Sequence, residues 1–282
     1  MLLYYTQASK HLADQIKIRK GNFIIKKFSD GEVYVRILDH AKNKKVWVLA
    51  STQAPAEHLL ELLFLLDALH REKAEISLLI PYFGYARQDR IVEPGECLSA
   101  EVVSSFIKKN KIKKIVVVHA HSALLKKFLN FEDCIPYPCY FSLAKKYDVI
   151  VAPDYGAFKV AQKLAKFVGK KVAWLEKHRP KQERVVTSKI HGKVRGKKVL
   201  IFDDLSVTGG TLLAANHVLK KHGAVHVDVL VTHGLFTPEA LQKLKKEKIE
   251  VYTTNTLYSS LDSMHVINIA EHLEKIMKEK HV

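Results

Sequence analysis

The chain has 282 residues, which is enough for one large α/β domain or two domains of ordinary size. Its 46 Lys and Arg residues outnumber 29 Asp and Glu residues and leave a formal net charge of +17. Such an excess suits nucleic acid, an anionic membrane or phosphorylated substrates, but much of it is lysine at helical, solvated positions and no nucleic-acid-binding motif accompanies it, so we expect no specific nucleic-acid partner.

The amino-terminal residues 1–21 do not have the pattern of a secretory signal, and no apolar run approaches the length that spans a bilayer. We therefore expect a cytoplasmic protein with no membrane partner. The three cysteines, Cys97, Cys134 and Cys139, are too few and too irregularly spaced for a disulfide framework or a zinc site, so reduced thiols are expected.

Strand-like apolar runs alternate with helical patterns along the whole chain, the clearest helical pattern covering residues 57–72. This alternation predicts an α/β fold with mainly parallel sheets flanked by helices. An irregular stretch with two prolines, residues 130–141, interrupts the pattern and indicates a domain junction. The predicted strands cover residues 24–28, 45–51, 76–83, 114–120, 148–154, 171–176, 198–204, 227–234 and 251–256.

The first polar segments in chain order are FSDGEVYVR (28–36) and PYFGYARQDR (81–90). The former places Phe28, Asp30 and Glu32 around Gly31 and by itself predicts only a hairpin-like turn. The latter follows a predicted strand, where its two arginines, Arg87 and Arg90, can bind phosphates and Gln88 and Asp89 can contact a base or a metal-bound water. A surface salt-bridge cluster is the alternative interpretation of the second segment.

Three further strands end in ionisable residues, at the edge where α/β proteins bind ligands. VVVHAHS ends in His119 and His121, and VIVAPDYG contains Asp154. The strand over 171–176 leads into a basic segment that contains Lys177 and Arg179. One such residue is more often structural than catalytic, but several strand ends of this kind favour a common site.

The most informative segment is VLIFDDLSVTGGT, residues 199–211. An apolar strand pattern ends on Asp203 and Asp204 and is followed by a loop with Gly209 and Gly210, which let the backbone turn and approach an anion. A helical pattern follows, whose amino-terminal N–H groups and dipole attract a phosphate, while the carboxylates can bind vicinal hydroxyls or a divalent cation. This predicts a ribose 5-phosphate site. An ordinary strand-to-helix turn is the alternative, which the strand and helix on either side disfavour.

The segment resembles the phosphoribosyl-pyrophosphate loop of the type I phosphoribosyltransferase superfamily. The chain as a whole resembles the ribose-phosphate pyrophosphokinase family, in particular its shorter archaeal-like members. The motifs that carry this resemblance occur in the family's order: FSDGE, YARQDR, APDYG, EKHR, DDLSVTGGT, THGLF and TNT. The resemblance implies two tandem phosphoribosyltransferase-like domains. Residues 1–140, completed by 265–282, would form the ATP side, and residues 141–264 the ribose 5-phosphate side.

The resemblance also implies a role for each matching residue. Lys177 and Arg179 would be catalytic, and His121 and Asp154 would be linked to Mg²⁺. ATP, the co-substrate, would be bound by Arg87 and Gln88, and by Phe28, Asp30 and Glu32 of a neighbouring subunit in a homo-oligomer of at least two chains. Ribose 5-phosphate would be bound by Asp203, Asp204, Thr208, Gly209, Gly210 and Thr211.

The implied reaction transfers a diphosphoryl group from ATP to the C1 hydroxyl of ribose 5-phosphate. Two positions depart from the family pattern: His119 stands where most members have aspartate, and the segment after Asp154 lacks a second glycine. Two alternatives stay open at this point. A phosphoribosyltransferase would share the DDLSVTGGT loop but leave FSDGE and YARQDR unexplained, and a non-catalytic regulatory homologue would not need both Lys177 and Arg179.

Overall fold

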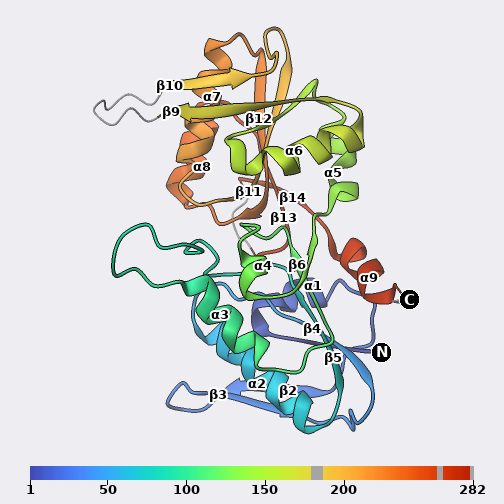
Figure 1. Ribbon diagram of the computed structural model, residues 1–282. Coiled ribbons are helices and arrows are strands. Elements are labelled where there is room, and N and C mark those ends of the chain that lie inside the picture. The colour runs from blue at the N-terminus through green and yellow to red at the C-terminus, as the bar shows by residue number, and fades with distance from the viewer. Residues whose placement is uncertain (179–186, 259–262, 280–282) are drawn as a thin grey trace. The chain divides into compact units, whose positions relative to one another are not determined.

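The structure, a computed structural model, describes residues 1–178, 187–258 and 263–279, with the backbone alone at 177, 178, 187 and 188. The chain forms two compact units (Figure 1). Unit 1 comprises Met1–Pro136, Thr256–Tyr258 and Ile269–Val282, and unit 2 comprises Tyr137–Asn255 and Ser259–Asn268. No helix in the described ranges is long and apolar enough to cross a membrane.

Unit 1 is built on a parallel five-stranded sheet and a separate antiparallel hairpin. The sheet has the order β1 (Leu2–Tyr5), β4 (Lys45–Leu49), β5 (Glu75–Ile80), β6 (Lys114–Val118) and β7 (Glu132–Cys134), and the hairpin is β2 (Phe23–Lys27) and β3 (Val33–Ile37). The helices are η1 (Gln7–Ser9), α1 (Lys10–Ala13), α2 (Glu57–Arg71), α3 (Ser99–Lys108), α4 (Leu125–Phe128) and α9 (Ala270–Lys278).

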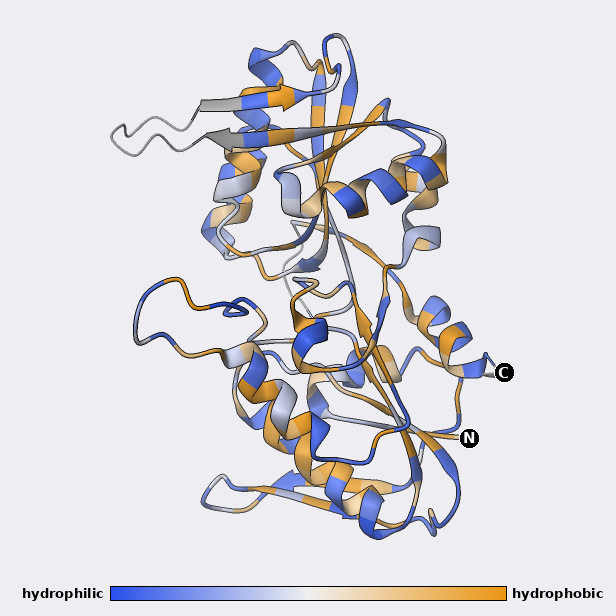
Figure 2. Cartoon of the chain, viewed as in Figure 1, coloured by the Kyte–Doolittle hydropathy of each residue, from blue (hydrophilic) through white to orange (hydrophobic). Residues whose placement is uncertain are grey.

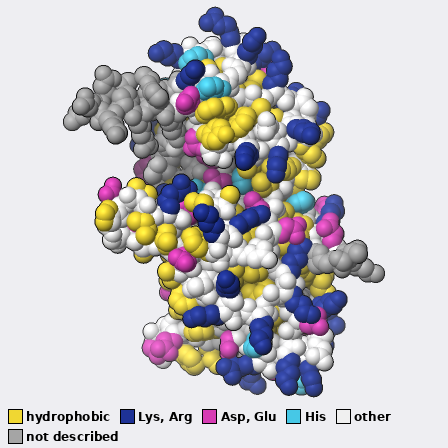
Figure 3. Space-filling model, in the orientation of Figure 1, with side chains coloured by type: hydrophobic (Ala, Val, Ile, Leu, Met, Phe, Trp, Pro, Cys, Tyr) yellow, Lys and Arg dark blue, Asp and Glu magenta, His cyan; other side chains and the backbone are white. Residues whose placement is uncertain are grey.

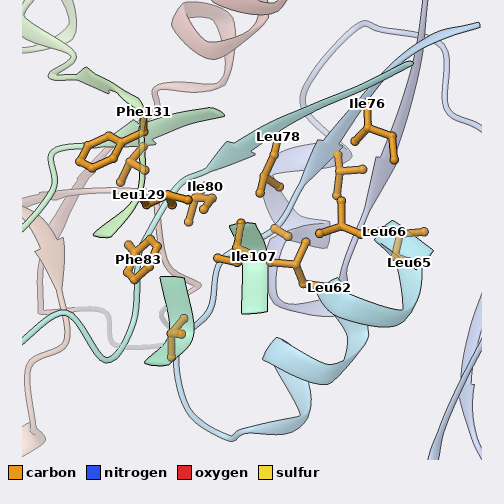
Figure 4. Packing of buried hydrophobic residues seen from close by; sticks show 14 of the residues in the cluster. Leu62, Leu65, Leu66, Ile76, Leu78, Ile80, Phe83, Ile107, Leu129 and Phe131 are labelled. Atoms are coloured by element: carbon orange, nitrogen blue, oxygen red, sulfur yellow. The ribbon is translucent and has the colours of Figure 1, made fainter. Parts of the chain in front are cut away.

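One face of the unit 1 sheet packs against α2 and α3. Leu62, Leu65 and Leu66 recur at helical spacing on α2 and are fully buried against Leu78 and Ile80 of β5, which alternate with residues of the other face (Figure 4). Burying a leucine side chain contributes about 1.5–3 kcal/mol, so this cluster holds the helices to the sheet.

Helix α9 belongs to unit 1, although the chain passes through unit 2 before reaching it. The Trp47 Nε1–H donates to the Met277 carbonyl (3.1 Å), and the Lys17 backbone N–H donates to Glu274 Oε2 (2.6 Å). Leu273 is fully buried on the same helix. The carboxyl-terminal helix is therefore an integral part of the first unit's packing.

Unit 2 has a seven-stranded sheet in which only β9 and β10 pair antiparallel. The strand order is β10 (Thr187–His191), β9 (Lys171–His178), β8 (Val149–Ala152), β11 (Lys198–Ser206), β12 (His226–Gly234), β13 (Val251–Thr254) and β14 (His265–Ile267). The helices are α5 (Tyr137–Ala144), α6 (Tyr155–Val168), α7 (Gly210–Lys221) and α8 (Pro238–Lys246). The predicted α/β fold with mainly parallel sheets and flanking helices is confirmed.

Each predicted strand is observed, with differences mainly at its ends, whereas β1, β3, β7, β10 and β14 were not predicted. β5 ends at Ile80 rather than residue 83, because Pro81 has no N–H for the ladder and the chain turns at Gly84. β11 instead continues through both aspartates to Ser206, since its partner β12 continues beside it to Gly234. The hydrophobic residues of these strands lie in the interior of each unit (Figure 2).

Candidate functional site

The carboxyl-terminal edge of the unit 2 sheet brings the predicted ribose-phosphate residues together. Asp203 and Asp204 lie near the carboxyl-terminal end of β11, where Asp203 is the register partner of Val231 of β12. The Asp204 backbone N–H donates to Asp203 Oδ1 (3.0 Å), which fixes the first carboxylate against the strand. Both residues are half-buried at this edge.

Three carboxylates repel one another at this edge. Burial raises the pKa of Asp203 well above its ordinary value, and the negative charges of Asp204 and Asp154 raise it further. Asp154 follows β8 and begins α6, where its Oδ1 accepts a hydrogen bond from the Ala157 backbone N–H (3.2 Å). A ligand that donates hydroxyl hydrogens, or a cation, would relieve this repulsion.

The loop after β11 presents the amino terminus of α7. Gly209 has φ 69° and stands at the N-cap of the helix, a left-handed conformation that favours glycine. Gly210 does not have a positive φ, and the nearest atom to a Cβ there would be Thr208 Oγ1 at 3.7 Å. The turn therefore requires glycine only at position 209. Glycine at position 210 would matter only if a ligand came close to the backbone there. Thr208, Gly210 and Thr211 are exposed at this helix end.

Backbone hydrogen bonds from the segment after β12 hold this loop in place. The Leu235 backbone N–H donates to the Ser206 carbonyl (3.0 Å), and the Thr237 N–H donates to the Val207 carbonyl (3.1 Å). Gly234 lies so close to β13 that a Cβ would be 2.7 Å from Thr253 Oγ1. Gly234 and Leu235 belong to the THGLF segment, which the sequence singles out. The sequence alone does not show that this segment lies beside the loop after β11.

The two predicted catalytic residues lie at the limit of the described structure. Lys177 is the penultimate residue of β9, where its backbone pairs with Ser188 of β10, and its side chain is not described. Arg179 lies outside the described residues. Their roles therefore stay predictions.

In unit 1, the predicted ATP residues Arg87 and Gln88 lie on the turn after β5. Gly84 is necessary there, because a Cβ would be 2.2 Å from the Thr52 carbonyl oxygen. The buried Thr52 Oγ1 accepts a hydrogen bond from the Gly84 N–H (2.8 Å), which ties the turn to the end of β4. Arg87 and Gln88 are exposed beyond this anchor.

The same edge of unit 1 brings the β5 and β6 exits together around Asp89. The Arg90 guanidinium donates to both Asp89 oxygens (2.8 and 3.2 Å), so Arg90 is engaged in an ion pair. The hydrogen bonds from Arg90 and Ser122 and the charge of His121 hold the pKa of Asp89 below its ordinary value. His121, the predicted metal-linked residue, is exposed beside this pair, whereas Asp154 belongs to unit 2.

His119 occupies an unusual backbone position. It is buried (4% exposed), has φ 44°, and its N–H donates to the Cys134 carbonyl (3.0 Å). Histidine and aspartate are both enriched in this left-handed region relative to other residues, so the backbone accepts either of them.

The remaining predicted ATP residues lie on the β2–β3 hairpin. Phe28 is 49% exposed and contacts Tyr34 edge-on with ring centroids 5.4 Å apart. Asp30 Oδ1 accepts the Glu32 backbone N–H (3.0 Å), and Gly31 has φ 95°, which confirms the predicted turn. No interaction joins the hairpin tip to Arg87 or Gln88 within the described part of unit 1.

No group of three or more His, Cys, Asp or Glu side chains is arranged to hold a metal ion within the described residues. Mg²⁺ commonly binds to one or two carboxylates together with substrate phosphates and water, so such a group is not required. The cationic side chains are spread over the visible faces of both units rather than gathered in one patch (Figure 3).

Two mainly parallel sheets, with a phosphate-type loop at the edge of the second, define a protein of the phosphoribosyltransferase fold class. A model of the N-terminal domain of ribose phosphate pyrophosphokinase matches residues 3–110, and a phosphoribosyl transferase domain model matches residues 137–273. The first match separates the chain from phosphoribosyltransferases that share only the second domain.

Relatives cover nearly the whole chain. A ribose-phosphate pyrophosphokinase of Maricaulis maris is 34% identical over 263 residues, covering 88% of this chain and 84% of that protein. One of Thermotoga maritima is 30% identical, covering 97% and 92%. A crystal structure of phosphoribosylpyrophosphate synthetase from Mycobacterium smegmatis superposes with a TM-score of 0.86 at 29% identity, covering 98% and 97%.

The chain belongs to the ribose-phosphate pyrophosphokinase family, and it is a ribose-phosphate diphosphokinase. The family and the activity expected from the sequence are thereby confirmed. The matches do not support the narrower expectation of an archaeal-like form.

Proposed function

We propose that ribose 5-phosphate binds at the carboxyl-terminal edge of the unit 2 sheet. The observation that carries this proposal is the placement of Asp203 and Asp204 directly before a loop that exposes the amino terminus of α7. The carboxylates accept hydrogen bonds from the ribose hydroxyls, and the loop residues Thr208, Gly209, Gly210 and Thr211 receive the phosphate.

ATP is assigned to unit 1, at Arg87 and Gln88. Their exposure on a turn that is firmly anchored by Thr52 supports a role in binding rather than in folding. Phe28, Asp30 and Glu32 are assigned to the adenine of a neighbouring subunit's ATP, in a homo-oligomer of at least two chains. The exposed Phe28 ring at the hairpin tip supports this second assignment.

The carboxylates of unit 2 have the chemistry that Mg²⁺ prefers, and their mutual repulsion fits a bound cation. Asp154 is the proposed metal-linked residue in unit 2, and His121, beside Asp89, is the one in unit 1. Bound Mg²⁺ would neutralise charge on the ATP phosphates.

In the proposed reaction, the C1 hydroxyl oxygen of ribose 5-phosphate forms a bond to the β-phosphorus of ATP. The bond between this phosphorus and the oxygen that bridges it to the α-phosphate breaks, so AMP leaves with that oxygen and the diphosphoryl group is transferred intact. Lys177 and Arg179 are assigned to the phosphoryl oxygens, which become more negative as the transition state forms.

A crossed binding experiment tests the division of substrates between the two units. Thr208→Ala is expected to weaken ribose 5-phosphate binding by about tenfold in calorimetric titration, because it removes a hydrogen-bonding partner, and to leave ATP binding unchanged. Arg87→Ala is expected to give the opposite pattern. If each variant loses both ligands equally, or loses the other unit's ligand, the assignment is wrong.

A further inference from the structure

A hollow of about 490 Å³ lies within unit 1, away from the residues assigned to the substrates. It is lined by the first residues of β4, β5 and β6 and by the end of α9. These strands are parallel, so the hollow is at the amino-terminal edge of the sheet, whereas Arg87, Asp89 and His121 follow its carboxyl-terminal edge. Its volume is within the range of small-molecule sites.

The hollow exists because a small residue stands between two large ones. Trp47, Ser77 and Lys114 are register partners on three neighbouring strands, and side chains that are paired in this way lie on the same face of a sheet. Ser77 has the shortest side chain of the three, so it leaves space between the indole of Trp47 and the stem of Lys114. Helix α9 covers this face up to Met277 and Lys278.

The floor of the hollow is largely apolar. The Trp47 Nε1–H donates to the Met277 carbonyl, so what remains of the indole is hydrocarbon surface. Met277 completes this floor. A surface of this kind binds the apolar body of a ligand.

The rim of the hollow is charged. Four lysines and two glutamates line it, and two further glutamates, Glu132 and Glu274, pair with rim lysines. Ion pairs bind Lys113 to Glu75 (2.9 Å), Lys114 to Glu132 (2.7 Å) and Lys278 to Glu274. Lys45 is the register partner of Glu75 and makes no ion pair within 4.0 Å to any residue that the structure describes. Because Glu75 is already bound by Lys113, the Lys45 ammonium group is the one best placed to bind an external anion.

We propose that this hollow is a binding site for a small amphipathic anion, with its apolar body on Trp47 and its anionic group at Lys45. The ligand class is an organic carboxylate or sulfonate of about ten to twenty non-hydrogen atoms, a size that suits such a volume. Because the hollow is at the edge of the sheet opposite to the ATP residues, the ligand and ATP bind independently.

The test uses 8-anilinonaphthalene-1-sulfonate, an aromatic anion whose fluorescence rises in apolar surroundings. We expect a saturable increase in its emission, with energy transfer from tryptophan, and we expect neither ATP nor ribose 5-phosphate to reverse it. Inorganic phosphate, which has no apolar body, is expected to compete only weakly. Full displacement by ATP would place the probe at the substrate site, and equally strong competition by phosphate would remove the role of the apolar floor; either result overturns the proposal.

Three variants locate the bound probe. Lys45→Glu is expected to weaken its binding by about tenfold, because the change reverses a charge close to the anionic group. Lys108→Glu is the matched control, since it makes the same charge change at an exposed position of α3, and it is expected to have little effect. Ser77→Leu is expected to abolish binding by filling the space, with circular dichroism and ribose-phosphate diphosphokinase activity unchanged. Equal binding by wild type and both hollow variants would contradict the proposal.

Discussion

Burial and neighbouring charges control the titration of Asp203, a residue of the proposed ribose 5-phosphate site. Burial and the nearby Asp204 and Asp154 raise its pKa, so its ionised form is costly in the folded state. A group whose pKa is raised by folding adds stability below its ordinary pKa, and that contribution is lost as the pH rises through its folded value. The ionised Asp203 carboxylate therefore lowers the folding stability of the unliganded protein at neutral pH.

Asp203→Asn is expected to raise the thermal stability of the unliganded protein at neutral pH, since it removes this repulsion. The gain should shrink as the pH falls toward the ordinary pKa of aspartate, where the wild-type carboxyl is protonated. Thermal unfolding across that pH range measures both trends. Asp67→Asn, at an exposed carboxylate on α2, is the control and should show neither trend. Loss of stability in Asp203→Asn at neutral pH would contradict the account.

Asp204→Asn is expected to raise the KM for ribose 5-phosphate by about tenfold or more, because it weakens a charge-assisted hydrogen bond to the sugar. The KM for ATP should change little. Steady-state kinetics with each substrate varied in turn makes the measurement. An unchanged KM for ribose 5-phosphate would remove Asp204 from the sugar site.

At the scale of elements, two adjacent glycines in the loop between β11 and α7 have different roles. Gly209 is needed for the backbone turn, and Gly210 is expected to leave room for the ligand. Gly209→Ala is expected to destabilise the protein by about 1–2 kcal/mol, because a side chain at φ 69° is strained. Gly210→Ala should leave stability nearly unchanged, since a Cβ meets nothing closer than 3.7 Å, but should raise the KM for ribose 5-phosphate. Chemical denaturation and kinetics of both variants separate the two roles; equal loss of stability would show that they share one.

The predicted catalytic residue Lys177 lies in strand β9, and Arg179 comes two positions later in the sequence. Lys177→Ala and Arg179→Ala are each expected to lower kcat by orders of magnitude with ribose 5-phosphate binding nearly intact, because their charges matter most in the transition state. Turnover and equilibrium binding are measured on the same preparations. Losses of equal size in both quantities would mark these residues as ground-state contacts.

Element type followed from sequence more readily than element ends did. The apolar runs of β4, β6, β8 and β12 are long and bounded by polar residues, so their periodicity predicts them. β10 was not predicted, because its residues make a strand only by pairing with β9. The anchors Thr52 and Thr237 were also missed, since their roles depend on contacts between strands and loops that no local pattern encodes.

At the scale of the whole molecule, the proposed function assigns one substrate to each of the two α/β units of the chain. The ordered motifs, which span both units, identified the family more securely than the charge of +17 could. Lysine and arginine side chains are scattered over the face shown in Figure 3 and do not by themselves distinguish a nucleotide enzyme from a nucleic-acid-binding protein. The proposed assignment of ATP to unit 1 and ribose 5-phosphate to unit 2 therefore rests on the residues at the carboxyl-terminal edges of the two sheets, and not on net charge.

The most direct test of this account is the release of AMP when the purified protein is incubated with ATP, Mg²⁺ and ribose 5-phosphate. We predict that AMP and phosphoribosyl pyrophosphate form in equal amounts, that neither forms without ribose 5-phosphate, and that removal of Mg²⁺ by a chelator stops the reaction. Release of ADP instead of AMP, or no phosphoribosyl pyrophosphate under these conditions, would contradict it.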